Sequence, residues 1–365
     1  MSLKALDLVI YSPDDIAKQV STRENETKIG QEIARLSSNR VSEIEANLQL
    51  ASLDGARYAL IGVPEDIGPR ANLGRGGADG AWKSFLQFFL NSQANQFFEP
   101  GRVLLLGHIQ VDDLMSSVEK LGQDGAVPVH KLRDFCAQID DRVFPVVEQI
   151  VAAGLEPIVI GGGNNNSFPT IKGVVRGLRR HGILKEGEGL PVVNCDAHAD
   201  FRILEGRHSG NSFTYAHAED FLSTYFVLAL QEAYNSRDMI ERLTNLGFPF
   251  ITYEEISVRQ EISFNDAVER ASEFIGEHGG RFGLELDLDT VAGVPSSADT
   301  PIGISHEEAQ RYIFTMASKL EASYLLLSEA APSLAADGNR RVGKTLSSFV
   351  LTYLKAREVF HSTNE

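Results

Sequence analysis

Two short acidic motifs in this sequence contain the residue types of a metal site. The first comprises Asp196, His198 and Asp200, and the second comprises Asp287 and Asp289. Each motif lies at the end of an apolar run that is typical of a buried strand. Side chains of an extended segment alternate between its two faces, so we expect the members of each motif to point the same way. Carboxylates gathered in this way repel one another, and one or two divalent cations are the simplest compensation.

Short apolar runs alternate with longer amphipathic segments from residue 56 onward. Strands are predicted at 58–62, 102–106, 156–160, 191–195, 225–230, 248–253, 282–289 and 324–328. Segments with helical spacing are 130–153, 167–182, 234–246, 264–278, 305–320 and 342–360. This alternation predicts a three-layer α/β/α fold with a central, mainly parallel sheet. Ligands of such sheets bind at the carboxyl ends of the strands, where both acidic motifs are expected.

The bulk properties narrow the class of protein. Residues 1–56 are polar and mostly helical in pattern, and we interpret them as an N-terminal extension of one α/β domain at 57–365. The net charge of −16 argues against nucleic acid and anionic membranes as partners. The apolar runs are too short to span a membrane, and no signal-peptide pattern opens the chain. Cys136 and Cys195 are the only cysteines, which suits a cytoplasmic location. We expect Cys195 to pack in the core.

Three motifs follow one another along the chain: the glycine-rich turn at 161–166, the Asp-x-His-x-Asp motif at 196–200 and the Asp-x-Asp motif at 287–289. Together they resemble the ureohydrolase superfamily of arginases, agmatinases and formimidoylglutamases. The resemblance covers residues 57 to 355. The loop 72–78, the triple glycine and the segment 207–213 look closest to formimidoylglutamase. Glu329 matches the acidic residue that faces the amidine group of the substrate in these enzymes.

The resemblance implies an arginase-like fold and one or two Mn²⁺ ions per chain. One ion would take Asn164, Asp196, Asp200 and Asp287, and the other Asp196, His198, Asp287 and Asp289. An oxygen-rich set with one imidazole suits Mn²⁺ better than Zn²⁺. Paired metals would lower the pKa of a water held between them, producing hydroxide that attacks an amidine or guanidine carbon.

Five further residues receive roles in this interpretation. Glu329 would hold the cationic N–C–N group, and His208 would protonate the leaving amine. Arg75, Ser209 and Asn211 are the candidates for binding the rest of the substrate. Three of the five have a structural alternative: a salt bridge for Arg75, an exposed loop position for His208, and a helix N-terminus for Glu329.

The sequence departs from the family pattern at three places. Asn164 stands where the family has a histidine ligand, and an amide oxygen is a weaker donor, so we expect one firmly held metal and one that is labile or absent. The Asp-Pro element that follows Asp-x-Asp in arginases is absent from 290–295. Ser209 aligns with the histidine that arginases use as a proton shuttle.

The expected activity is metal-dependent hydrolysis of a linear amidine or guanidine. The best substrate is N-formimidoyl-L-glutamate, which gives L-glutamate and formamide in histidine degradation. Arginine, agmatine or another guanidino acid is the alternative substrate. A non-catalytic relative with a weakened metal site is the alternative from another class. Enzymes of this kind commonly self-associate, so a homo-oligomer is expected.

Overall fold

A nine-stranded sheet forms the centre of the computed structural model, which describes residues 6–123 and 125–364. The strand order is β1-β3-β2-β4-β9-β8-β5-β6-β7, and every neighbouring pair is parallel except β1 with β3. The strands are β1 (Leu8–Ile10), β2 (Tyr58–Gly62), β3 (Val103–Ile109), β4 (Glu156–Ile160), β5 (Leu190–Cys195), β6 (Leu222–Leu230), β7 (Phe250–Thr252), β8 (Arg281–Asp287) and β9 (Glu321–Ser328).

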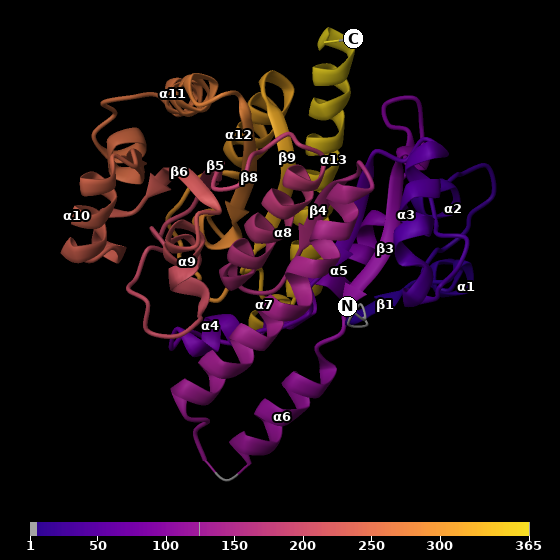
Figure 1. Ribbon diagram of the computed structural model, residues 1–365, viewed down its shortest axis with the longest axis horizontal. Helices are drawn as coiled ribbons and strands as arrows, with labels where there is room; N and C mark the ends of the chain where they lie inside the picture. The colour runs from indigo at the N-terminus through magenta and orange to yellow at the C-terminus, as the bar shows by residue number, and fades with distance from the viewer. Residues whose placement is uncertain (1–5, 124, 365) are drawn as a thin grey trace.

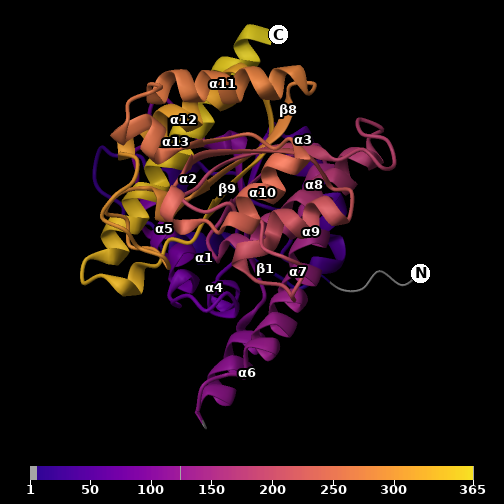
Figure 2. The same cartoon turned by 90° about the vertical axis from the view of Figure 1, so that its left-hand side faces the viewer.

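Helices cover both faces of the sheet, as Figures 1 and 2 show. One layer contains α3 (Ile44–Leu53), α7 (Val129–Ala152), α8 (Ser167–Arg180), α9 (Ser212–Ala218) and α10 (Arg237–Leu246). The other contains α5 (Ala81–Phe89), α11 (Phe264–Glu277), α12 (His306–Lys319) and α13 (Gly338–Asn364). Three short α-helices are also present: α1 (Pro13–Ala17), α2 (Ile29–Glu32) and α4 (Ile67–Ala71). The helix α6 (Asp112–Gly122) projects from the body in both views.

The predicted three-layer fold is confirmed, with shifts at element ends. All eight predicted strands and all six predicted helices are present. Among the described residues the structure adds β1, which joins the sheet from the N-terminal segment, and the helices α4, α5, α6 and α9, which lie outside the predicted helical segments. No helix of the described chain is both long enough and apolar enough to cross a membrane.

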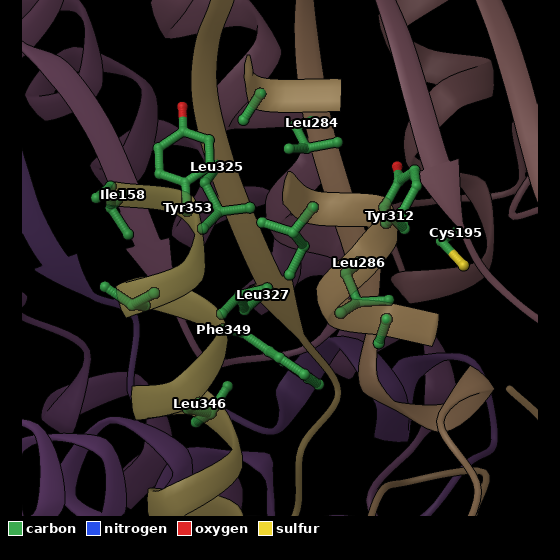
Figure 3. Close-up of a cluster of buried hydrophobic side chains, with 14 of the residues drawn as sticks. Ile158, Cys195, Leu284, Leu286, Tyr312, Leu325, Leu327, Leu346, Phe349 and Tyr353 are labelled. Atoms are coloured by element: carbon green, nitrogen blue, oxygen red, sulfur yellow. The ribbon is translucent and has the colours of Figure 1, made fainter. Parts of the chain in front are cut away.

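Two apolar cores lie on opposite faces of the sheet, because the inner strands are buried on both sides. Figure 3 shows part of one core, where Leu325 and Leu327 of β9 and Leu286 of β8 face Phe349 of α13. Cys195 lies in this core and is fully buried, as its place at the end of an apolar strand predicted. Burial of apolar surface on this scale stabilises the sheet by roughly 25 cal/mol per Å².

The N-terminal segment is attached to the sheet through β1 and Tyr11. β1 pairs with β3, and Ile10 lies opposite Gly107. The Tyr11 hydroxyl accepts a hydrogen bond of 2.9 Å from the indole N–H of Trp82, which is buried in the core. Gly107 has φ 142°, and a Cβ there would lie 1.9 Å from the carbonyl oxygen of Val9. Only glycine therefore lets β1 lie this close to β3.

We expect Gly107→Ala to lower the free energy of unfolding by about 3 kcal/mol, because overpacking and left-handed strain each cost about 1–3 kcal/mol. Urea denaturation measures the loss. Gly55→Ala is the matched control, since Gly55 also has positive φ (104°) but no atom lies within 4 Å of the place that a Cβ would take. Equal losses in the two variants would show that the Val9 carbonyl contact carries no cost.

Candidate metal centre

The two acidic motifs meet at the carboxyl ends of β5 and β8. A cavity of about 300 Å³ lies there, and it is lined by His198 and Asp200 of the first motif and by both aspartates of the second. Glu329, just after β9, also lines it. α4 and the residues that follow it, including Pro69 and Asn72, form another wall of the cavity. The strand ends therefore bring together the polar clusters that the sequence separates, as expected for an open parallel sheet.

The first motif converges through a turn. β5 ends at Cys195, so the expected alternation of an extended strand does not extend to Asp200. Instead, Asp196 Oδ1 accepts a hydrogen bond of 2.7 Å from the backbone N–H of His198. Asp200 adopts φ 45°, a left-handed conformation that is uncommon for a residue with a side chain. Strain of this kind at a cluster of acids is typical of a functional site.

The second motif also departs from the predicted strand. β8 ends at Asp287, and Asp289 lies in a 3₁₀ turn, because the Asp287 carboxylate accepts a hydrogen bond of 2.9 Å from the Asp289 N–H. The two carboxylates still face the same cavity. The structure thus brings the side chains of each motif together, as predicted. It does so through turns after the strands, so the predicted cause, alternation along an extended strand, was wrong.

Two overlapping groups of ligand atoms result. Asp196, His198 and Asp289 form one group, and Asp196, Asp200 and Asp287 form the other, with the atoms of each within 4.8 Å of one another. His198 Nδ1 lies 3.3 Å from Asp289 and 3.6 Å from Asp196. The other oxygen of Asp289, Oδ1, is buried and has no hydrogen-bond partner among the residues that the structure describes. Carboxylates with a single imidazole and an unpartnered oxygen fit a divalent cation such as Mn²⁺.

Electrostatics within the cluster are unfavourable without a cation. Burial, then the charge of Asp289, raises the pKa of Asp287 well above its usual range. Burial and Asp196 do the same to the pKa of Asp200. Burial alone would lower the pKa of His198, but Asp289 and Asp196 outweigh it and raise that pKa well above its ordinary value. The raised pKa values of the two carboxyls report negative charge that the surroundings fail to compensate, and the raised pKa of His198 shows that this negative charge favours a cation.

Asn164 turns its amide nitrogen toward the carboxylates. Its Nδ2 donates to Asp200 at 2.6 Å and lies 3.4 Å from Asp196. Its Oδ1 accepts hydrogen bonds from Ser167 and Ser328 at 2.8 and 3.0 Å. In this orientation the amide partly compensates the acids. Ligation through Oδ1 requires the amide to rotate by half a turn.

The glycine-rich turn that carries Asn164 is held by a buried carboxylate that the sequence did not reveal. Glu65, just beyond β2, accepts hydrogen bonds from the N–H groups of Gly68 and Gly163 and from the amide of Asn166. Gly162 has φ 73°, and a Cβ there would lie 2.7 Å from Glu65. The turn thus needs glycine for its close approach to Glu65. Its sequence signal is an acidic residue three positions after the end of the apolar strand β2.

Glu329 lies at the bottom of the cavity, only 3% exposed and with φ 64°. One carboxylate oxygen accepts a hydrogen bond of 2.7 Å from the Asn164 N–H, and the other contacts the Ser297 hydroxyl. Burial raises the pKa of Glu329 to about 8. A cation beside this carboxylate would favour its ionised form.

Comparison with known proteins identifies the family. The model of the arginase family matches residues 56–350, which is most of the chain. The chain belongs to the arginase family. A formimidoylglutamase of Streptococcus pyogenes is 27% identical over 266 residues, covering 70% of this chain and 71% of the relative.

Solved structures of arginase-family proteins share the fold. A Trypanosoma cruzi formiminoglutamase with Mn²⁺ is 22% identical, with a TM-score of 0.65 over 90% of this chain and 99% of that one. The Bacillus subtilis formimidoylglutamase is 18% identical, with a TM-score of 0.70 over 92% of this chain and 93% of that one. These likenesses establish the arginase-like α/β fold.

His208 and Asn211 do not line the cavity of this arginase-family chain. The His208 ring is buried rather than exposed, and its Nδ1 accepts a hydrogen bond of 3.1 Å from the Gly210 N–H. Burial, with Arg133 nearby, lowers the pKa of His208 to about 4. A buried neutral ring is poorly placed to protonate a leaving group. The Asn211 amide bonds to its own loop, accepting from Arg207 and donating to Gly206.

Arg75 also lies outside the cavity lining. Its guanidinium donates to the carbonyl oxygens of Ser296 and Ser297 at 3.2 and 3.0 Å. It therefore fixes the loop whose Ser297 contacts Glu329, in place of the expected contact with substrate. Ser209, by contrast, does line the cavity, and its hydroxyl lies 3.4 Å from the Asn72 amide.

Arg202 is a cavity residue that the sequence interpretation overlooked. It is exposed, lines the cavity, and follows Asp200 by two positions. Among the described residues no carboxylate lies within 4.0 Å of its guanidinium. A cationic side chain is thus present at the mouth of a cavity whose floor is acidic. The sequence indicated Arg202 only through its position two residues after Asp200 of the first acidic motif.

Arg207 connects the two loops of the site to α7. Its guanidinium pairs with Asp140 at 2.7 Å and donates to the Asn165 carbonyl at 2.8 Å. It also lies 4.9 Å from the ring centroids of Phe168 and Tyr215. Arg207 and Asp140 are both buried. This ion pair holds the turn that carries Asn164 against the loop that carries Ser209.

We expect Arg207→Ala to lower the free energy of unfolding by about 3–5 kcal/mol, because it leaves the Asp140 carboxyl buried without its partner. Guanidinium denaturation followed by circular dichroism measures this change. Arg176→Ala is the control and should cost less than about 1 kcal/mol, since Glu148 keeps its contact with Arg180 at 2.6 Å. A loss near that of the control would mean that Arg207 does not anchor the loops.

Proposed function

We propose that this chain hydrolyses the C–N bond of a linear amidine, with N-formimidoyl-L-glutamate as its substrate. The observation that carries the proposal is the charge order along the cavity. Buried Glu329 lies on the floor, and exposed Arg202 lies at the mouth. N-formimidoyl-L-glutamate has the complementary order, with a cationic amidine at one end and carboxylates at the other. The formimidoylglutamases among the relatives support the same substrate.

The metal in this proposal is Mn²⁺. Asp196, His198 and Asp289 would hold one ion, and Asp196, Asp200 and Asp287 a second, with Asn164 as the weaker ligand. Bound Mn²⁺ would supply a hydroxide nucleophile at neutral pH by lowering the pKa of water. The second ion should be the more labile, because Asn164 must give up its hydrogen bond to Asp200 in order to ligate.

The residues of the chain account for substrate positioning. The Glu329 carboxylate, oriented by Ser297 and the Asn164 N–H, accepts hydrogen bonds from both nitrogens of the amidine. Arg202 binds a carboxylate of the substrate, and the Ser209 hydroxyl adds a polar contact along the cavity. Binding at both ends holds the amidine carbon beside the acidic cluster, and such orientation lowers the barrier to attack.

Guanidino compounds are the second candidate substrates, because a guanidinium offers the same N–C–N edge to Glu329. Arginine and guanidinobutyrate carry a carboxylate for Arg202, whereas agmatine carries none. Because agmatine has no carboxylate to pair with Arg202, we expect it to be the poorest substrate of the three.

We expect the Mn²⁺-loaded protein to release formamide from N-formimidoyl-L-glutamate and to lose that activity in EDTA. The same assay with arginine, agmatine and guanidinobutyrate ranks the substrates, and added Mn²⁺ should restore turnover. The expected metal content after desalting is closer to one ion than to two. If protein with bound Mn²⁺ hydrolyses none of these compounds, the proposed activity is wrong and a non-catalytic relative is favoured.

We expect Arg202→Ala to raise KM for N-formimidoyl-L-glutamate by about tenfold or more with little change in kcat, because it removes a charge-assisted contact with the substrate. Arg202→Lys should recover part of the loss, since it keeps the charge without the planar fork. Steady-state kinetics measure both constants. An unchanged KM in Arg202→Ala would exclude this residue from substrate binding.

A further inference from the structure

A buried glutamate that the proposed hydrolysis does not use lies directly behind the metal centre. Glu285 belongs to β8, two residues before Asp287, and is 1% exposed. It lies opposite Asn194 of β5, in the interior of the sheet. In the described part of the chain no lysine, arginine or histidine pairs with it, and the charge that acts on its pKa is that of another acid, Asp196. A buried carboxylate without a cation is costly, so its hydrogen bonds indicate what it does.

Two hydroxyl groups contact the Glu285 carboxylate. Ser167 Oγ, at the start of α8, lies 2.5 Å from Oε2, and the Tyr324 hydroxyl of β9 contacts Oε1. Both of these residues are fully buried. Burial raises the pKa of Glu285 to about 7, whereas the hydrogen bonds from Ser167 and Tyr324 act in the opposite direction. The two hydroxyls therefore favour the ionised carboxylate, which accepts a hydrogen bond from each.

The Ser167 hydroxyl has one proton but faces two acceptors. Besides Glu285, it lies 2.8 Å from Oδ1 of Asn164. A hydroxyl can donate only one hydrogen bond, and an ionised carboxylate is a stronger acceptor than an amide oxygen. When Ser167 donates to Glu285, its oxygen and the Asn164 oxygen face each other without a proton between them. The observed amide orientation, with Nδ2 toward Asp200, thus leaves one contact of Ser167 unsatisfied.

Rotation of the Asn164 amide by half a turn satisfies both contacts. Nδ2 would then donate to Ser167 Oγ, which in turn donates to Glu285. The Oδ1 atom would face the acidic cluster, where a metal ligand is needed. Ser328 Oγ lies 3.0 Å from the same Oδ1 atom, but it contacts no carboxylate among the described residues, so its hydroxyl is free to donate or to accept. Of these two serines, only Ser167 therefore has a preferred direction.

From this proton count we propose that Glu285 and Ser167 are positioning residues that hold Asn164 in the orientation that ligates the more labile Mn²⁺ ion. The inference rests on the proposed function, because it concerns an ion assigned there. Glu285 fixes the direction of the Ser167 proton, and this direction favours the amide orientation with Oδ1 toward the metal. The pair thereby offsets part of the hydrogen bond to Asp200 that Asn164 gives up on ligation. Neither Glu285 nor Ser167 lines the substrate cavity.

Titration of the metal-free full chain with Mn²⁺ at about pH 8 tests the proposal, followed by calorimetry and by electron paramagnetic resonance. Glu285→Gln is the main variant. To accept from Tyr324, its amide must turn the nitrogen toward Ser167, which then donates to Asn164 Oδ1 and holds the other orientation. We expect the affinity for the second Mn²⁺ ion to fall about tenfold in Glu285→Gln and in Ser167→Ala. Both variants should keep the hyperfine spectrum of an isolated Mn²⁺ ion at concentrations at which the wild-type protein shows a coupled pair.

Two further variants separate positioning from a general structural role. Ser328→Ala is the matched control, because Ser328 contacts the same amide oxygen without a preferred direction, and its affinity should change by less than about twofold. Asn164→Asp removes the choice of orientation, since a carboxylate has an oxygen on either side. In the Asn164→Asp background, Ser167→Ala should therefore no longer weaken the second ion. A purely structural effect of Ser167 would persist in that background.

The proposal is overturned if Glu285→Gln and Ser167→Ala bind the second ion as tightly as the wild-type protein, or if their losses persist in Asn164→Asp. Thermal midpoints without metal show whether each variant folds. Glu285→Gln preserves the side-chain volume and keeps both hydroxyls paired, so it maintains the test if Ser167→Ala does not fold. Wild-type protein that binds a single ion in excess Mn²⁺ would also overturn the inference, but not the hydrolysis. Wild-type protein that binds no Mn²⁺ would overturn the proposed function as well.

Discussion

Repulsion among buried carboxylates is the constraint on which the rest of this structure depends. Asp196, Asp200, Asp287 and Asp289 converge at one edge of the sheet, each less than a tenth exposed. Three of them have raised pKa values, first because of burial and then because of one another. A fold tolerates such a cluster only where a cation compensates it and the scaffold resists relaxation.

The scaffold meets that requirement with hydrogen bonds and with strain. Glu65 fixes the glycine-rich turn, Arg207 ties that turn to the next loop, and Asn164 places its amide against Asp200. Asp200 and Glu329 hold left-handed backbone conformations that would otherwise relax. The polar network thus does two things, since it keeps the acids together and keeps Glu329 beside them.

The fold was largely predictable from the sequence, because buried parallel strands appear as short apolar runs and the helices between them have a clear period. β1 was not predicted because a segment of three residues is too short to show a hydrophobic period. The site was predictable only as a set of residue types. The motif aspartates and His198 were found by spacing, but turns rather than strand alternation bring them together. Glu65, Arg202 and the buried state of His208 depend on contacts between distant segments, which a pattern along the chain does not contain.

The two outer strands of the sheet have a consequence for the behaviour of the protein in concentrated solution. β1 and β7 are three residues each, whereas the strands between them have five to nine. Short margins offer few unpaired peptide groups to another molecule, which limits edge-to-edge aggregation. Leu8–Ile10 pairs with the Gly107–Ile109 end of the apolar strand β3, and the backbone of Ala34 bonds to Val103 and Leu105 at its other end. The short N-terminal strand therefore also protects the sheet against intermolecular pairing.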